Sequence, residues 1–248
     1  MPLLGEAALA MWWDVPAARR ADLEHWHAHE HFPERLALPG FLRASRWTSA
    51  SGGDGFFVMY ELADHAVLAS PAYVARLNAP SPWSTRMMPL HHHMVRSQCR
   101  VLASAGAVTA RHALTIRLSP AAGRDAELRS HLVDLATSVV TRPGLVGLHL
   151  LRHEPPALAP TTEQKIRGGG DRVADWVLLA CGYDAAALGA LATAELADAA
   201  LAAHGAAGDS VRHLYALACA ATPDDVRGLP ACDPVPNHLL SPPPEETP

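Results

Sequence analysis

The sequence predicts an α+β protein made of two βαββαβ units whose antiparallel sheets pack together as one barrel within the chain. Three observations lead to this fold. Strand-like and helix-like segments follow one another in the same order twice. A Pro-Gly turn stands at the same place in both copies, at residues 39–40 and 143–144. Each unit leaves one sheet face bare, and the other sheet is the simplest cover for it.

In the first copy, an apolar strand is followed by a helix that Pro33 should end, because proline lacks an N–H group and clashes with the preceding turn. Asp64 is a plausible N-cap for the second helix, and Pro71 suggests that this helix consists of two short pieces. A Pro-rich, irregular connection over 78–83 leads to the last strand. The expected strands are 7–14, 41–48, 56–62 and 92–103, and the expected helices are 18–31 and 64–77.

The second copy has the same order, and its first helix carries an apolar stripe at helical spacing, Leu128, Leu132 and Leu135. A polar loop over 154–174 is longer than its counterpart in the first copy. The expected strands are 111–119, 145–153, 175–182 and 210–221, and the expected helices are 124–141 and 185–204. The two units are ferredoxin-like repeats over residues 5–105 and 110–222, and a Pro-rich C-terminal tail, 223–248, is expected to be an extended strap or disordered.

Composition excludes several classes of partner. The chain has 248 residues and a net charge of −5, so neither nucleic acid nor an anionic membrane surface is an expected partner. No apolar run is long enough to cross a membrane. The cysteines are scattered and form no CxxC motif, which indicates reduced thiols and a cytoplasmic protein. They are Cys99, Cys181, Cys219 and Cys232.

The candidate site lies on the first helix, where ionisable side chains occupy the face that should be apolar. On an α-helix Leu23, Trp26, His27 and Glu30 share one face, and His31 lies at its edge. Burying such polar groups without partners costs roughly 2–7 kcal/mol each. They must therefore either pair with one another or face a pocket.

In a pocket, His27 or His31 would be a general base, and Glu30 would fix the tautomer of the histidine and raise its pKa. The competing interpretation is a structural network in which Arg35 pairs with Glu30 or Glu34. The residues expected to bind a substrate are Trp26, Tyr60, Trp83 and Arg86.

Metal and nucleotide signatures are weak. His27 and His31 have the i, i+4 spacing of two metal ligands, but the H-E-x-x-H order is absent and a third ligand is not evident, so no metal is predicted. The triplet His91-His92-His93 should alternate between the two faces of its strand, and a polar strand edge is its expected role. The run Gly168–Gly170 lacks the rest of a phosphate-binding loop.

The segment W-H-x-H-E-H-x-P-E-R-L-x-L-P-G-F, residues 26–41, resembles the dimeric α+β barrel superfamily, in particular its EthD-like branch, here as a tandem repeat. That superfamily includes antibiotic-biosynthesis monooxygenases, muconolactone isomerases, small polyketide cyclases and haem-binding chlorite dismutase-like proteins. The motif covers the first copy only: His131 aligns with His27, but Asp134 and Leu135 replace Glu30 and His31. The resemblance therefore implies a site in the first copy, and it does not specify a reaction.

Three functions follow as hypotheses. The first is a cofactor-free enzyme that acts on a small, largely apolar organic compound by proton transfer, as in isomerisation, cyclisation or oxygenation. The second is a non-catalytic module that binds a small ligand or a partner chain. The third is a haem-binding protein with one histidine as axial ligand. A small organic molecule is the expected partner, and a homodimer is a further possibility.

Overall fold

The computed structural model describes residues 2–53 and 55–229, and these residues fold into a closed eight-stranded antiparallel barrel. The strand order around the barrel is β1-β3-β2-β8-β5-β7-β6-β4. The predicted fold class, an α+β barrel formed within one chain, is confirmed. The strands are β1 (Ala7–Asp14), β2 (Phe41–Ser49), β3 (Gly55–Leu62), β4 (His92–Gly106), β5 (His112–Pro120), β6 (Leu145–His153), β7 (Trp176–Gly182) and β8 (Ala206–Ala221).

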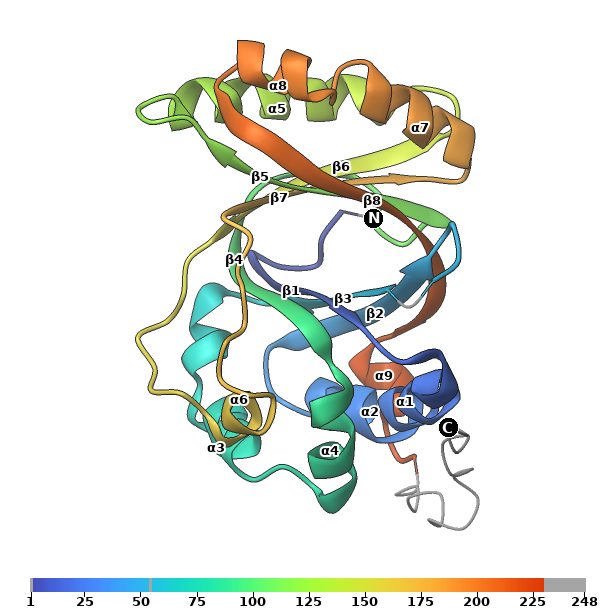
Figure 1. Ribbon diagram of the computed structural model, residues 1–248, viewed down its shortest axis with the longest axis vertical. Coiled ribbons are helices and arrows are strands. Elements are labelled where there is room, and N and C mark those ends of the chain that lie inside the picture. Colours follow the sequence, from blue (N-terminus) through green and yellow to red (C-terminus); the bar gives the residue numbers. More distant parts are fainter. Residues whose placement is uncertain (1, 54, 230–248) are drawn as a thin grey trace, which may run out of the picture.

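Each half of the chain contributes one four-stranded sheet. In the N-terminal half (7–106) the order is β4-β1-β3-β2, and in the C-terminal half (112–221) it is β8-β5-β7-β6. The pairs β2–β8 and β4–β6 join the two sheets, so neither sheet keeps a free edge. Figure 1 shows the resulting layers, with helices above one sheet and below the other. The α-helices are α1 (Arg20–Trp26), α2 (Phe32–Leu36), α3 (Pro71–Asn78), α4 (Pro82–Met87), α5 (Asp125–Val139), α6 (Thr162–Ile166), α7 (Ala185–Thr193), α8 (Asp198–Ala203) and α9 (Pro223–Val226).

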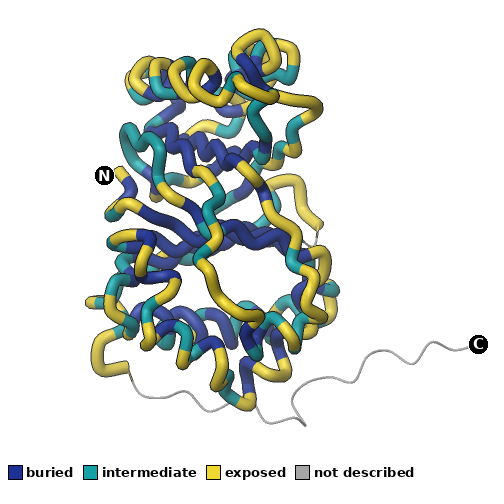
Figure 2. The backbone as a smooth tube through the Cα atoms, turned by 90° about the vertical axis from the view of Figure 1, so that its left-hand side faces the viewer, coloured by how far each residue is buried: buried dark blue, intermediate teal, exposed yellow. Residues whose placement is uncertain are grey.

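Strand alternation produces one core inside the barrel and one under each helix layer. On β1, Leu9 and Met11 face the helices of the N-terminal half, whereas Ala8, Ala10 and Trp12 belong to the barrel interior. The strands are therefore buried on both faces, as the dark tube in Figure 2 shows. The interior holds large aromatic side chains together with the two buried thiols, and these residues include Trp47, Phe57, Tyr215, Cys99 and Cys181.

The barrel interior also contains a buried ion pair. Arg43 on β2 donates two hydrogen bonds to Glu61 on β3, at 2.6 and 2.7 Å, and both side chains are buried. This fork-shaped pairing compensates both charges. The pair joins neighbouring strands of one sheet.

The two Pro-Gly turns have the same geometry. Gly40 has φ +89° and Gly144 has φ +86°, a conformation that favours glycine. In each turn the glycine carbonyl accepts a backbone N–H that follows the third strand of its half, from Ala63 in one and from Asp184 in the other. A Cβ on Gly40 would lie 2.4 Å from Val67 Cγ2, so glycine is required there also by the close approach of the next helical segment.

The first helix differs from the prediction. It does not end at Pro33, because His27–His31 form a π-helical turn (η2) and the chain then continues as α2 to Leu36. Pro33 lies in the first turn of α2, where proline is well tolerated because a backbone N–H is not needed for a helical hydrogen bond. A proline at the start of a new helical segment is therefore tolerated where one inside an uninterrupted α-helix is not.

Three other segments also differ. The connection predicted as irregular contains α4, with Ser81 as N-cap and Pro82 at the start. The helix predicted over 185–204 is divided into α7 and α8. The loop predicted over 154–174 contains α6, and the helix over 64–77 is two pieces, as expected, with Asp64 capping the first. The start of the predicted tail forms α9, which contacts α2, whereas 230–248 and Cys232 lie outside the described residues.

No helix within the described ranges is both long enough and apolar enough to cross a membrane.

Candidate functional site

The π-helical turn places two histidines on the inner side of the first helix. A π-turn contains more residues per turn than an α-helix, so residues four apart lie nearly one above the other. His27 and His31 are both buried, and their rings stack with centroids 5.3 Å apart. His29 points outward and its Nδ1 bonds the carbonyl of His25. The turn therefore directs a pair of imidazoles toward the sheet.

These histidines line a cavity between the outer face of the N-terminal sheet and the helices that cover it. The cavity volume is about 30 Å³, which is room for one or two water molecules. Its wall combines apolar and ionisable side chains from β1, β3, β4, the first helix, α3 and the α6 region. The lining residues are Leu9, Met11, Trp13, His27, His31, Arg35, Tyr60, Tyr73, Met88, His91, Met94, Arg96, Glu163 and Arg167.

The three histidines of the cavity are held in their neutral form. Burial lowers the pKa of His27 and of His31 well below the usual value, and the positive charge of nearby Arg35 adds to the effect in both. Burial also lowers the pKa of His91 to about 4, with Arg167 contributing, although a hydrogen bond to the Met88 carbonyl opposes the shift. At neutral pH each ring therefore has a nitrogen that can accept a proton.

The arginines of the cavity differ in how their charge is compensated. Arg35 donates to Glu34 at 3.0 Å and also forms a short hydrogen bond with Glu163. Arg167 pairs with Asp171 at 2.8 Å.

Arg96, in contrast, donates to the hydroxyl of Tyr73 at 3.0 Å, and no carboxylate of the described residues lies within 4 Å of its guanidinium. Arg96 is buried. It therefore brings a positive charge without a carboxylate partner to the wall of the cavity that the three histidines also line.

Several polar atoms of the cavity wall have no hydrogen-bond partner among the described residues. They include Nδ1 of His27, Nδ1 of His31 and the hydroxyl of Tyr60. A buried polar atom without a partner costs about 1–3 kcal/mol. Burial also raises the pKa of Tyr60, so its hydroxyl keeps its proton and can donate it. The cavity thus presents acceptors and a donor that a small polar molecule would satisfy.

The other predicted site residues lie elsewhere. Glu30 accepts hydrogen bonds from Trp26 Nε1 at 3.0 Å, from Ser81 at 2.5 Å and from Ser84 at 3.2 Å. Its bonds do not reach the histidines as we predicted, because the π-turn separates its direction from that of His27. Glu30 instead ties the first helix to α4.

Of the four predicted substrate-binding residues, only Tyr60 lines the cavity. Trp26 is fully buried behind His31, with ring centroids 4.4 Å apart, and so forms a second layer. Trp83 packs against His25 on the outer side of the first helix, and Arg86 is exposed on α4.

Sequence reasoning missed five histidine, arginine and glutamate residues that line the cavity. His91 was assigned to a polar strand edge, but a residue with φ +54°, His93, breaks the alternation, and His91 turns inward while His92 and His93 are exposed. The α6 region had a usable signal, the capping box of Thr161 and Gln164, which predicts a helix start inside the polar loop. The missed residues are Arg35, His91, Arg96, Glu163 and Arg167.

No group of three or more His, Cys, Asp or Glu side chains in the described ranges is placed to hold a metal ion. A haem does not fit the cavity as it stands, since small-molecule sites range from about 300 to 1,000 Å³ and this one is far smaller. His131, the counterpart of His27 in the C-terminal half, stacks on His204, and neither ring lines the cavity of His27.

The fold and the site define a ferredoxin-like α+β barrel with one polar cavity between its N-terminal sheet and helices. No model of a known protein family matches the sequence, and no curated protein matches it either.

Solved structures match in fold. A candidate monooxygenase from Fusobacterium nucleatum has a TM-score of 0.60 at 9% identity, covering 88% of this chain and 95% of that chain. An anthrone oxidase-like protein has a TM-score of 0.60 at 10% identity, covering 90% of this chain and 96% of that chain. A candidate monooxygenase from Lactobacillus acidophilus has a TM-score of 0.54 at 8% identity, covering 88% and 97%. At such identities the likeness shows the fold alone.

Proposed function

We propose that this protein is an enzyme that needs no cofactor and acts on a small, largely apolar organic compound by histidine acid/base chemistry. The observation that carries the proposal is that His27 and His31 are neutral, buried and unpartnered at Nδ1 while they share a cavity with Arg96. A neutral imidazole has a free lone pair that can take a proton from carbon, and a nearby positive charge can stabilise the enolate that this leaves.

In the proposed step, a C–H bond next to a carbonyl group breaks. Its proton goes to an imidazole nitrogen of His27 or His31, and its electron pair moves into the carbonyl to form an enolate. The guanidinium of Arg96 and the hydroxyl of Tyr60 stabilise the negative charge as it develops, and such stabilisation is larger in a small buried cavity than in bulk water. Return of the proton to a different atom of the substrate completes an isomerisation, so the atoms balance without a further reactant.

Oxygenation is the variant that the names of the structural neighbours favour, since they include candidate monooxygenases and an anthrone oxidase-like protein. It would need dioxygen as co-reactant with the enolate. The first step, removal of the proton, is common to both reactions and is therefore the step to test.

The test is exchange of substrate hydrogen for deuterium, followed by ¹H NMR in D₂O on a panel of small ketones and 1,3-dicarbonyl compounds, each compared with its exchange in buffer alone. We expect the wild-type protein to accelerate exchange of at least one compound, and we expect His27→Gln or His31→Gln to reduce the rate by about 10²–10⁴-fold. His92→Gln is the matched control, because His92 is exposed and outside the cavity. No acceleration of exchange for any compound, or equal rates in all variants, would refute the proposal and leave a non-catalytic binding module.

We also propose that the chain arose as a tandem copy of one EthD-like unit. The equal strand orders of the two halves and the equal geometry of the turns at Gly40 and Gly144 support this origin. The cytoplasmic location and the homodimer remain predictions.

A further inference from the structure

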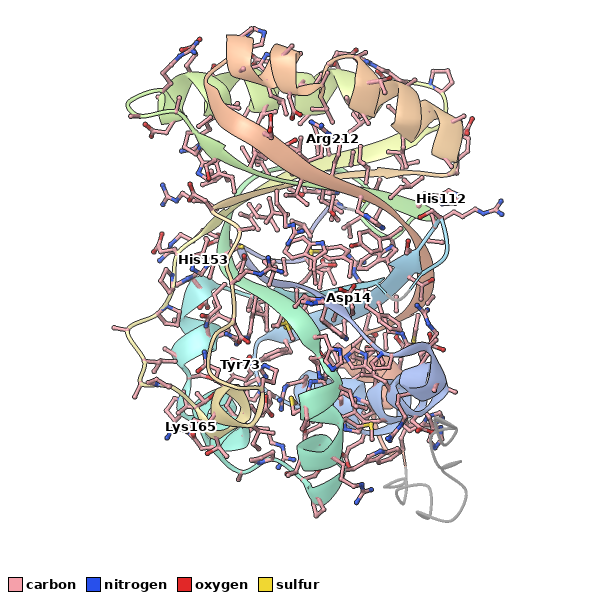
Figure 3. All side chains as sticks on the ribbon, viewed as in Figure 1. Asp14, Tyr73, His112, His153, Lys165 and Arg212 are labelled. Atoms are coloured by element: carbon pink, nitrogen blue, oxygen red, sulfur yellow. The ribbon has the colours of Figure 1, made fainter. Side chains whose placement is uncertain are left out.

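The short helix α6 closes the candidate cavity from the C-terminal half. It lies in the connection between β6 and β7 and contacts α3 of the N-terminal half. Figure 1 shows this long connection descending beside the barrel to α6, and Figure 3 shows Lys165 of α6 in the same region below the barrel as Tyr73 of α3. A helix of five residues is not stable by itself, so its position depends on its contacts with the rest of the protein.

A second cavity of about 160 Å³ lies on the other side of α6. Thr161 and Gln164 line this outer cavity, whereas Glu163 lines the inner one. Arg96 borders both. The α6 segment together with Arg96 therefore separates an outer space from the histidines. Since the inner cavity holds only one or two waters, an organic substrate can enter only if part of its wall moves.

The main contact that holds α6 in place is an ion pair. The carboxylate of Glu163 forms a short hydrogen bond with Arg35, and both side chains are at most 4% exposed. A weaker contact runs from the Thr162 N–H to the side chain of Asn78, at 3.0 Å. Directly after α6, Gly168 and Gly169 have φ of +96° and +76° in open space, so the chain can change direction there at little cost.

Moving Glu163 away would leave the buried guanidinium of Arg35 with Glu34 alone. Breaking a buried ion pair costs much more than exchanging one partner for an equivalent one. A ligand that brings its own carboxylate restores the pair, whereas a neutral ligand of the same shape does not. The closed state thus contains a carboxylate at the place where a ligand's acid group could bind.

We propose that α6 is a lid latched by Glu163, and that the substrate is a small organic acid whose carboxylate replaces that of Glu163 on Arg35. The apolar walls Leu9, Trp13 and Met94 would then contact its hydrocarbon part. The inference rests on the proposed function only in calling the ligand a substrate. The predicted binding itself does not require catalysis. It assigns Arg35 and Glu163 to ligand selection and leaves proton transfer to the histidines.

The experiment compares benzoate with benzamide, a neutral analogue of nearly equal shape, by titration of tryptophan fluorescence and by calorimetry. We expect the wild-type protein to bind benzoate at least tenfold more tightly than benzamide. We expect Glu163→Gln to bind benzoate at least tenfold more tightly than wild type, because the competing carboxylate is gone, and to bind benzamide more tightly by a smaller factor, because the lid opens more often. Glu154→Gln is the matched control: it removes a carboxylate from the start of the same connection, where the side chain is 38% exposed, and should change neither affinity.

Hydrogen exchange followed by mass spectrometry measures the lid directly. In Glu163→Gln, amides of residues 161–169 should exchange at least tenfold faster than in wild type, while amides of β1 should be unchanged. Unaltered or weaker benzoate binding in Glu163→Gln, or unaltered exchange over 161–169, overturns the lid. Tighter benzoate binding in Glu163→Gln together with no accelerated deuterium exchange in the wild-type protein would keep the lid and refute the proposed function, so the two failures are distinguishable.

Discussion

The buried histidines make the stability of the fold depend on pH, and His91 allows the size of the effect to be worked out. Its pKa is about 4 in the folded protein and 6.5 is the ordinary value for an unfolded chain. Below 6.5 the unfolded chain binds a proton that the folded protein does not bind, so stability falls as pH falls. At pH 5 this difference costs about 2 kcal/mol for His91.

His149 inside the barrel adds a similar amount, because burial lowers its pKa to about 4 as well. His27 and His31 act in the same direction. We therefore expect the free energy of unfolding to be at least about 4 kcal/mol lower at pH 5 than at pH 7.5, a large part of the typical total of 5–15 kcal/mol.

The variant His91→Asn isolates one contribution. The Asn amide can donate to the Met88 carbonyl, as His91 Nδ1 does at 3.0 Å, but it does not titrate. Urea unfolding followed by tryptophan fluorescence should show that the loss of stability between pH 7.5 and pH 5 is about 2 kcal/mol smaller in this variant than in wild type. His92→Asn, with an exposed side chain, is the control and should keep the wild-type loss. If His91→Asn loses as much stability as wild type over the same interval, then His91 is not held neutral and the electrostatic description of the cavity is wrong.

Three further predictions concern the scaffold. Arg43→Met should lower the free energy of unfolding by about 3–5 kcal/mol, because it leaves Glu61 buried without its partner, and the double change with Glu61→Met should recover most of the loss in urea titrations. Gly40→Ala should cost about 2 kcal/mol or more, since φ is +89° and the new Cβ meets Val67, whereas Gly123→Ala, at φ +76° in open space, should cost about 1 kcal/mol in the same assay; equal costs would refute the close contact. Burial raises the pKa of both thiols in the barrel interior, so these two cysteines should resist alkylation in the native protein and react after unfolding, as peptide mapping by mass spectrometry would show.

The fold could be predicted because its signals are local and occur twice. Strand alternation, the two Pro-Gly turns and the apolar stripe of α5 are each legible from a few neighbouring residues. The π-turn could not be predicted, because one extra residue in a turn leaves no mark in the spacing of apolar side chains. The prediction therefore placed Glu30 beside the histidines, whereas its hydrogen bonds run to α4 and only the histidines line the cavity.

The candidate site could be predicted only in part, because most of its charges come from segments far apart in the sequence. Three of the predicted site residues, His27, His31 and Tyr60, line one cavity in the structure. Arg96 and Glu163 were not predicted, since the first looks like an ordinary strand charge and the second lies in a polar loop. Both residues join Arg35 in the cavity wall because of how β4 and the β6–β7 connection pack. A local sequence pattern does not predict such packing.

A gene shortened after β4 would still encode every histidine of the cavity but neither Glu163 nor Arg167, since these two lie beyond residue 160. Because the cavity needs residues from both halves, each chain is expected to bind one ligand molecule there. Insertions and deletions between β6 and β7 would leave the strand pairing of the barrel intact. They would change the α6 segment that closes the cavity. Diversification of ligand preference among descendants of this chain is expected to concentrate in the length and composition of that connection.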